Sequence, residues 1–147
     1  MSAEQIVRDF LSDYETYGVD EVDPYMADNL IFRQPGLPDG GKEDFKGVGR
    51  VIKMALPDWK WNVQSIATNG NQVTVLMHWT GTHTGTFLLS RMIAGMPDMP
   101  ASGKKVSAPD KFVFGITGDK ISLVEIHEVA NGGLPAMLAQ LGIALPQ

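Results

Sequence analysis

The chain has no cysteine, and its 147 residues contain no apolar run of about 18 residues. The missing cysteine excludes disulfides, thiol catalysis and zinc–thiolate sites. No membrane-spanning helix is expected, and the first ten residues, MSAEQIVRDF, carry acidic side chains that a signal peptide would lack. We therefore predict a cytoplasmic protein that has no membrane partner.

Positive charge is also scarce. Twelve Lys and Arg residues stand against 17 Asp and Glu residues, which gives a net charge of −5 and a pI of about 5.0. The densest basic pair is Lys104-Lys105, whereas a nucleic-acid binder usually gathers its basic residues on one face. We predict no nucleic-acid partner.

Motifs for cofactors and metals are missing as well. The glycines from Gly81 to Gly85 do not open a helix and lack the spacing of a phosphate-binding loop. The three histidines are well separated and have no acidic partner at ligand spacing. We therefore predict no cofactor and no metal site.

The length predicts one domain over residues 1–147. Apolar residues recur with helical periodicity over residues 3–17. Asp23-Pro24 resembles the start of a short second helix that runs to about Asn29. A third helix is expected over residues 43–56, before Pro57.

The rest of the chain favours strands. Apolar and polar residues alternate, and Asn69-Gly70 is a strong hairpin signal. The expected strands and a closing helix cover residues 59–64, 72–80, 106–114, 121–129 and 134–141. This pattern predicts an α+β fold, in which a curved antiparallel sheet and N-terminal helices form a cone around an apolar cavity.

Asp110 is the strongest candidate for chemistry. In a strand it shares one face with Ala108, Phe112 and Phe114. A carboxylate on an apolar face is costly unless it is paired or protonated, so such groups often mark functional sites. In the alternative interpretation, Asp110 faces solvent beside Lys111.

Glu125 and His127 are the next candidates. If Phe114 pairs with Ile121, Asp110 lies opposite Glu125, and His127 is one pair further along. Two carboxylates this close cannot both ionise cheaply, so the pair would supply an acid and a base. A shift of the strand register by one residue would remove this arrangement and leave Glu125 facing solvent.

A further set of side chains is predicted to line the pocket and bind the substrate: Tyr14, Phe32, Gln34, Trp61, Trp79, His83, Met96 and Phe112. The Tyr14 hydroxyl and the Gln34 amide could orient a carbonyl group. Met96 belongs to the methionine-rich segment 87–102, which is either a lid or an ordinary packed loop or dimer contact. The alternative role for His83 is structural, at a bend.

Several motifs resemble the SnoaL-like polyketide cyclase family of the nuclear-transport-factor-two-like superfamily. They are Leu56-Pro57-Asp58-Trp59, Gly81-Thr82-His83-Thr84-Gly85 after a Val-x-Val-x-x-x-Trp strand, and Gln140-Leu141-Gly142. The resemblance implies the cone-shaped α+β fold. The superfamily includes cyclases, isomerases, dehydratases and non-enzymatic binding modules, so it leaves the activity open.

The chain departs from these relatives at their acidic residues. The ketosteroid isomerases have an aspartate before the proline that ends the first strand, where this chain has Gln34. The resembled cyclases have an acid near the end of the last strand. The nearest positions here are Glu128, Asn131, Gly132 and Gly133. An enzyme of this kind would need Asp110 or Glu125 in that role.

These observations predict a cofactor-free acid/base enzyme of the cyclase, isomerase or dehydratase kind that acts on a small hydrophobic carbonyl compound. Asp110 would move the proton, and Tyr14 or His127 would donate a hydrogen bond to the oxyanion. The alternative is a non-catalytic module that binds small molecules or dimerises. A second copy of the chain is a candidate partner, because the outer sheet face must be polar or covered.

Overall fold

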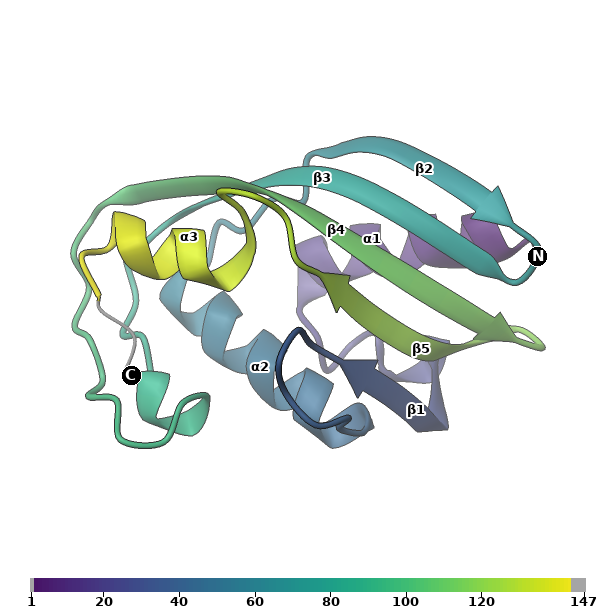
Figure 1. Cartoon of the computed structure of the whole chain (residues 1–147), viewed down its shortest axis with the longest axis horizontal. Coiled ribbons are helices and arrows are strands. Elements are labelled where there is room, and N and C mark those ends of the chain that lie inside the picture. Colours follow the sequence, from purple (N-terminus) through teal and green to yellow (C-terminus); the bar gives the residue numbers. More distant parts are fainter. Residues whose placement is uncertain (1, 144–147) are drawn as a thin grey trace.

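The predicted α+β fold is confirmed by a computed structural model that describes residues 2–143 (Figure 1). The elements, with two short 3-10 turns, are α1 (Ala3–Tyr17), η1 (Asp23–Tyr25), β1 (Met26–Arg33), α2 (Lys42–Ala55), β2 (Val63–Asn69), β3 (Gln72–Thr82), η2 (Leu89–Arg91), β4 (Lys105–Thr117), β5 (Lys120–His127) and α3 (Gly133–Gln140). In the described part of the chain, no helix is long and apolar enough to cross a membrane.

The five strands form one curved sheet in the order β1-β5-β4-β3-β2. Neighbouring strands from β2 to β5 are antiparallel, whereas β1 runs parallel to β5. The sheet is therefore mixed, and not entirely antiparallel as the sequence predicted. Helices α1 and α2 lie on one side of it, and α3 lies beside the part of β4 that extends past β5 (Figure 1).

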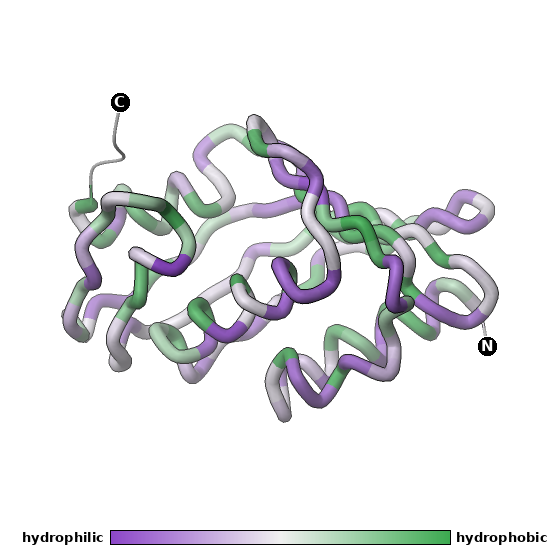
Figure 2. The backbone as a smooth tube through the Cα atoms, turned by 90° about the horizontal axis from the view of Figure 1, so that it is seen from below, coloured by the Kyte–Doolittle hydropathy of each residue, from purple (hydrophilic) through white to green (hydrophobic). Residues whose placement is uncertain are grey.

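The two long helices follow the sequence prediction closely. In α1, Phe10 and Tyr14 belong to a buried stripe, and the Ser2 hydroxyl accepts a hydrogen bond from the Gln5 amide at 3.1 Å. Gly18 ends the helix with φ of 99°, and its N–H bonds the carbonyl of Tyr14. Figure 2 shows hydrophobic and hydrophilic residues alternating along the helical coils, as expected for helices that bury one face.

The short helix predicted after Asp23-Pro24 is wrong. The structure has a single 3-10 turn there, and β1 begins already at Met26. Met26, Leu30 and Phe32 are buried, so pairing with β5 and burial of these side chains outweigh the local helix signal. A helix of one or two turns has little stability of its own.

The predicted pairing of Phe114 with Ile121 is also wrong. The register between β4 and β5 shifts between Gly115 and Ile116, so Ile121 pairs with Ile116 and Phe114 pairs with Val124. A Cβ on Gly115 would come within 2.9 Å of a β5 side chain, so glycine permits this close approach. Beyond this irregularity, each residue of β5 pairs with a different residue of β4 from the one that a regular hairpin would give it.

The predicted strand over residues 59–64 is mostly irregular. Lys60 makes an isolated bridge with Thr80, and Asn62 has a positive φ of 49° before β2 begins at Val63. The Asn62 side chain donates hydrogen bonds to the carbonyl of His78 and to the Thr80 hydroxyl. This segment is thus held firmly against β3, although it is not a regular strand.

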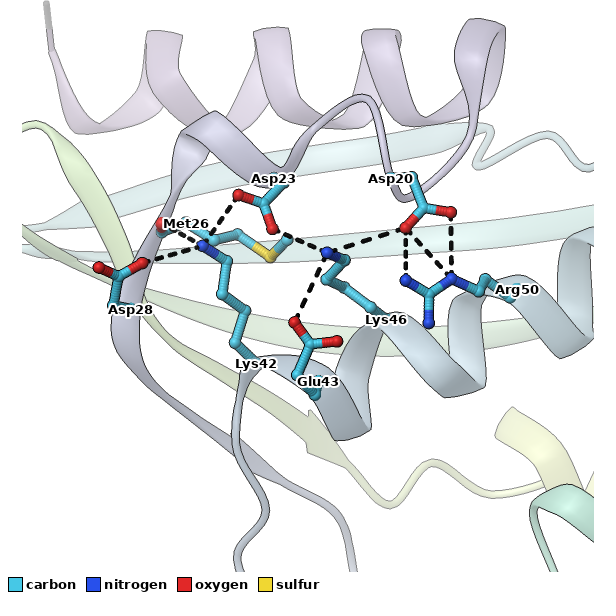
Figure 3. A network of polar contacts seen from close by, with 8 residues as sticks. All are labelled: Asp20, Asp23, Met26, Asp28, Lys42, Glu43, Lys46 and Arg50. Carbon is cyan, nitrogen blue, oxygen red and sulfur yellow. Dashed lines mark hydrogen bonds and ion pairs between the residues drawn. The ribbon is translucent and has the colours of Figure 1, made fainter.

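Charged side chains connect α2 to the segment between α1 and β1 (Figure 3). Lys42 and Lys46 both contact Asp23, at 3.0 and 2.8 Å, and Arg50 contacts Asp20. The side chains of both lysines are only 11% exposed. These ion pairs join α2 to the segment that leads from α1 into β1.

Candidate functional site

Asp110 lies in β4, opposite Met77 of β3, and is only 8% exposed. Its face of the strand also carries Ala108, Phe112 and Phe114, which are all buried. The carboxyl group therefore belongs to the apolar side of the sheet and does not extend into solvent beside Lys111.

Two N–H groups donate hydrogen bonds to this carboxyl. The Trp79 indole Nε1 donates to Oδ2 at 3.2 Å, and the Lys111 amide donates to Oδ1 at 2.9 Å. Burial raises the pKa of Asp110 to about 6, while both hydrogen bonds act in the opposite direction. The group therefore changes charge close to neutral pH, as a general acid or base should.

The turn before α3 packs directly on this part of β4. A Cβ on Gly132 would lie 2.2 Å from the carbonyl oxygen of Pro109. A Cβ on Gly133, whose φ is +65°, would lie 4.0 Å from both carboxyl oxygens of Asp110. Sequence reasoning did not connect this turn with Asp110, although the double glycine is a signal of close backbone approach.

Aromatic rings surround the same region. Tyr14 lies 5.0 Å from Trp61, and Trp61 lies 5.6 Å from Phe112, measured between ring centroids. Trp59 and Trp79 stack at 5.1 Å. The structure thus brings together four of the predicted pocket residues (Tyr14, Trp61, Trp79 and Phe112), and adds Trp59, which alternates with Trp61 in the sequence.

The expected pairing of Asp110 with Glu125 is wrong. Glu125 pairs with Val113, and His127 pairs with Lys111, so both lie on the other face of the sheet from Asp110. Glu125 accepts hydrogen bonds from Arg33 at 3.1 Å and from His127, and these interactions, Arg33 first, lower the pKa of Glu125. Glu125 and Asp110 therefore cannot share a proton.

The remaining predicted residues lie elsewhere. Phe32 is buried on β1, two strands from β4, and Gln34 is half-buried just after β1. His83 is buried one residue past the end of β3 and six positions from the residue opposite Asp110, which corresponds to about 20 Å. Its Nδ1 pairs with the Ser102 hydroxyl at 2.8 Å, an arrangement that fits the structural alternative.

The methionine-rich segment 87–102 is closed on itself. Phe87 and Met99 exchange backbone hydrogen bonds, and Asp98 accepts hydrogen bonds from the amide and hydroxyl of Ser90. Phe87 is fully buried, and Met96 is 8% exposed. These contacts are those of an anchored, packed loop.

Two hollows on the described residues lie away from Asp110. One of about 390 Å³ is lined by Asp58, Thr80, Gly81, Thr82, Lys105, Val106 and Ser107. The other, of about 280 Å³, is lined by Ile6, Pro24, Tyr25, Asp119 and Lys120. Neither of these two hollows is lined by Asp110.

Within residues 2–143, no cluster of three or more His, Asp or Glu side chains is arranged to hold a metal ion.

Residues 4–131 match the model of a family described as SnoaL-like polyketide cyclase. No curated protein matches the sequence. AclR, a proposed hydroxylase from Streptomyces galilaeus, is 15% identical, with 95% of each chain covered and a TM-score of 0.78. A proposed SnoaL-like polyketide cyclase from Jannaschia sp. CCS1 is 18% identical, with 93% of this chain and 90% of that one covered and a TM-score of 0.73.

IdmH from Streptomyces antibioticus, a proposed polyketide cyclase, is 18% identical, with 97% of this chain and 100% of that one covered and a TM-score of 0.71. Identities this low establish a common fold and nothing finer.

Proposed function

The chain belongs to the SnoaL-like polyketide cyclase family, and we propose that it is an acid/base enzyme that moves a proton next to a carbonyl group of a small hydrophobic, polyketide-like substrate. The observation that carries this proposal is the buried carboxyl of Asp110, whose pKa is raised to about 6. A group with this pKa can accept a proton near neutral pH and return it within one catalytic cycle.

The proposed reaction has two proton transfers and no net oxidation. A carboxylate oxygen of Asp110 takes a proton from the carbon beside the carbonyl, and the C–H electron pair becomes the double bond of an enolate. The enolate then attacks a second carbonyl of the same molecule with its carbon, or it is protonated at another carbon. Asp110 returns its proton in both cases, to the new alkoxide in the first and to that carbon in the second.

Tyr14 is a proposed donor to the enolate oxygen. Burial raises the pKa of Tyr14 above its ordinary value, so the hydroxyl keeps its proton at neutral pH. Its ring contacts Trp61, which in turn contacts Phe112 on the face of Asp110. Glu125 and His127 take no part in the proposed reaction, because they lie on the other face of the sheet.

The position of Asp110 supports its use in place of the family's late-strand acid. The positions nearest to that acid in this chain are Glu128, Asn131, Gly132 and Gly133, none of which is an aspartate. A Cβ on Gly133 would lie 4.0 Å from both oxygens of Asp110. A carboxyl thus stands beside the late-strand position, although it is supplied by β4.

One observation favours the alternative, a non-catalytic module of the same fold. The aromatic rings near Asp110 pack against one another, and neither hollow described above reaches the carboxyl. In such a module, Asp110 would serve only to hold Trp79 and the turn before α3 in place.

Hydrogen–deuterium exchange distinguishes an acid/base enzyme from such a module. We expect the wild-type protein to accelerate deuterium incorporation beside the carbonyl of 1-tetralone in D₂O, followed by proton NMR. Asp110→Asn should lower the enzyme-dependent rate by about 100-fold or more, because a positioned acid or base contributes at least that much. The wild-type rate should rise with pH through about 6, as Asp110 ionises.

Asp119→Asn is the matched control, because Asp119 lies in the exposed turn between β4 and β5. It removes the same charge and should leave the rate unchanged. Equal exchange rates for the wild type and Asp110→Asn would reject the catalytic role. Exchange no faster than in buffer would favour the non-catalytic module.

A further inference from the structure

All three tryptophans of the chain form one buried cluster. Trp59 stacks on Trp79 with 5.1 Å between ring centroids and meets Trp61 edge-on at 5.2 Å. Trp79 donates its indole N–H to Asp110. The cluster therefore extends directly from the carboxyl group.

The indole donors of Trp59 and Trp61 differ from that of Trp79. Both Nε1 atoms are buried and have no hydrogen-bond partner among residues 2–143. The residues themselves are only 6% and 5% exposed. Leaving such a donor unpaired costs about 1–3 kcal/mol, and folded proteins seldom do so. Two unpaired donors on rings that contact each other therefore indicate an acceptor that residues 2–143 do not supply.

The segment that carries Trp59 and Trp61 is fixed in place by hydrogen bonds. The backbone of Lys60 pairs with Thr80, and the Trp61 amide donates to the carboxylate of Glu15 at 2.9 Å. The side chain of Asn62 fixes the following residue of the segment against β3. Both indoles are thus held in place by contacts on either side of them in the chain.

We infer that Trp59 and Trp61 are substrate-recognition residues that donate their indole N–H groups to oxygen atoms of the ligand, an assignment that rests on the proposed function of Asp110. An indole is only a donor, so the ligand atoms must be acceptors such as carbonyl, ether or enolate oxygens. The stacked rings favour a planar, apolar frame for those oxygens.

The two donors would act most strongly on the reaction intermediate. An enolate oxygen carries the negative charge that Asp110 creates when it removes the proton. A hydrogen bond to a charged oxygen in a dry site is stronger than one to a neutral carbonyl. The cluster would therefore place a base and two oxyanion donors within one set of contacting side chains.

Nitrogen-15 NMR tests this assignment directly, because three tryptophans give three indole signals. The signals are assigned from single Trp→Phe variants and titrated with 1-tetralone, and then with tetralin, the same frame without the oxygen. With tetralone we expect the Trp59 and Trp61 protons to move downfield and Trp79 to stay nearly fixed. Tetralin should not cause the downfield shift.

The variants Trp59→Phe and Trp61→Phe provide a second measurement. Each should weaken tetralone binding by about tenfold through the lost hydrogen bond and change tetralin binding far less. Equal shifts with both ligands, or equal losses for both, would overturn the assignment. Failure of the wild-type protein to bind tetralone would contradict the proposed ligand class.

Asp110→Asn separates this inference from the proposed function. If that variant binds tetralone with the same indole shifts but exchanges no deuterium, Asp110 and the tryptophans have the roles proposed for them. If wild-type exchange is fast and the indole signals do not respond, Asp110 is catalytic and the recognition role is wrong. If the signals respond and neither protein exchanges deuterium, the cluster binds ligands without catalysis.

Discussion

Asp110 should make the protein less stable as pH rises, which is opposite to the usual effect of an acidic residue. Its pKa is raised from 3.8 to about 6, so the folded state holds the proton more tightly than the unfolded chain. The group therefore lowers the free energy of unfolding as pH rises from about 4 to 6, by up to about 3 kcal/mol above that range. Asp110→Asn should gain this much relative to the wild type between pH 4 and pH 7, as measured by urea unfolding.

Asp98→Asn is the control of opposite sign. Hydrogen bonds from Ser90 lower the pKa of Asp98, so its contribution is present above about pH 4 and is lost as pH falls through the lowered value. This variant should lose stability relative to the wild type as pH rises. If the stability of both variants relative to the wild type changed in the same direction with pH, the ionised carboxylate of Asp110 would not be buried.

Single residues show what the sequence can predict about the site. The buried face of Asp110 follows from simple alternation in β4, and the structure agrees. The pairing of β4 with β5 ends at Lys111, one residue short of Asp110, and this could not be predicted because the register depends on the irregularity at Gly115 and Ile116. The unpaired donors of Trp59 and Trp61 depend on tertiary packing and carry no sequence signal of their own.

At the scale of elements, the turn before α3 should be intolerant of side chains. A Cβ on Gly132 would lie 2.2 Å from the carbonyl oxygen of Pro109, so Gly132→Ala must push α3 away from β4. We expect a loss of about 1–3 kcal/mol in urea unfolding, as for other overpacked sites. The two hydrogen bonds between Gln140 and the backbone of Ser107 should weaken in the same variant.

Gly47→Ala is the matched control within a helix. Nothing lies within 4 Å of a Cβ at this position of α2, so alanine should add about 0.5–1 kcal/mol through its better helix propensity. Opposite signs for the two glycine substitutions would support close packing of the turn on Pro109. A stable Gly132→Ala variant with intact α3 hydrogen exchange would contradict it.

Some elements are formed by local interactions and others by contacts between distant segments of the chain. The helices α1 and α2 and the turn at Asn69-Gly70 have strong local signals, and the sequence predicts them within about one residue, whereas the strand before this turn begins only at Val63. The strand β1 was mistaken in part for a helix, because its pairing with β5 joins segments about 90 residues apart. Local propensity cannot report a contact of that range.

At the scale of the whole molecule, the charged network around Lys46 should connect the helical layer to the sheet (Figure 3). Its ammonium group contacts Asp23 at 2.8 Å and Asp20 at 3.8 Å, from the segment that leads into β1. Asp23 is also held by Lys42. These ion pairs lower the pKa values of Asp20 and Asp23 below their usual range, Asp20 chiefly through Arg50.

Lys46→Met should therefore lower the urea midpoint at pH 7 clearly more than Arg8→Met. Arg8 forms an exposed pair with Glu4 within α1, and such pairs contribute little. The stability from Asp20 and Asp23 is present above about pH 4 and lost as pH falls through their lowered pKa values, so the cost of Lys46→Met should shrink at about pH 2.5. An equal cost at both pH values would mean that the apolar stem of Lys46, and not its charge, joins α2 to β1.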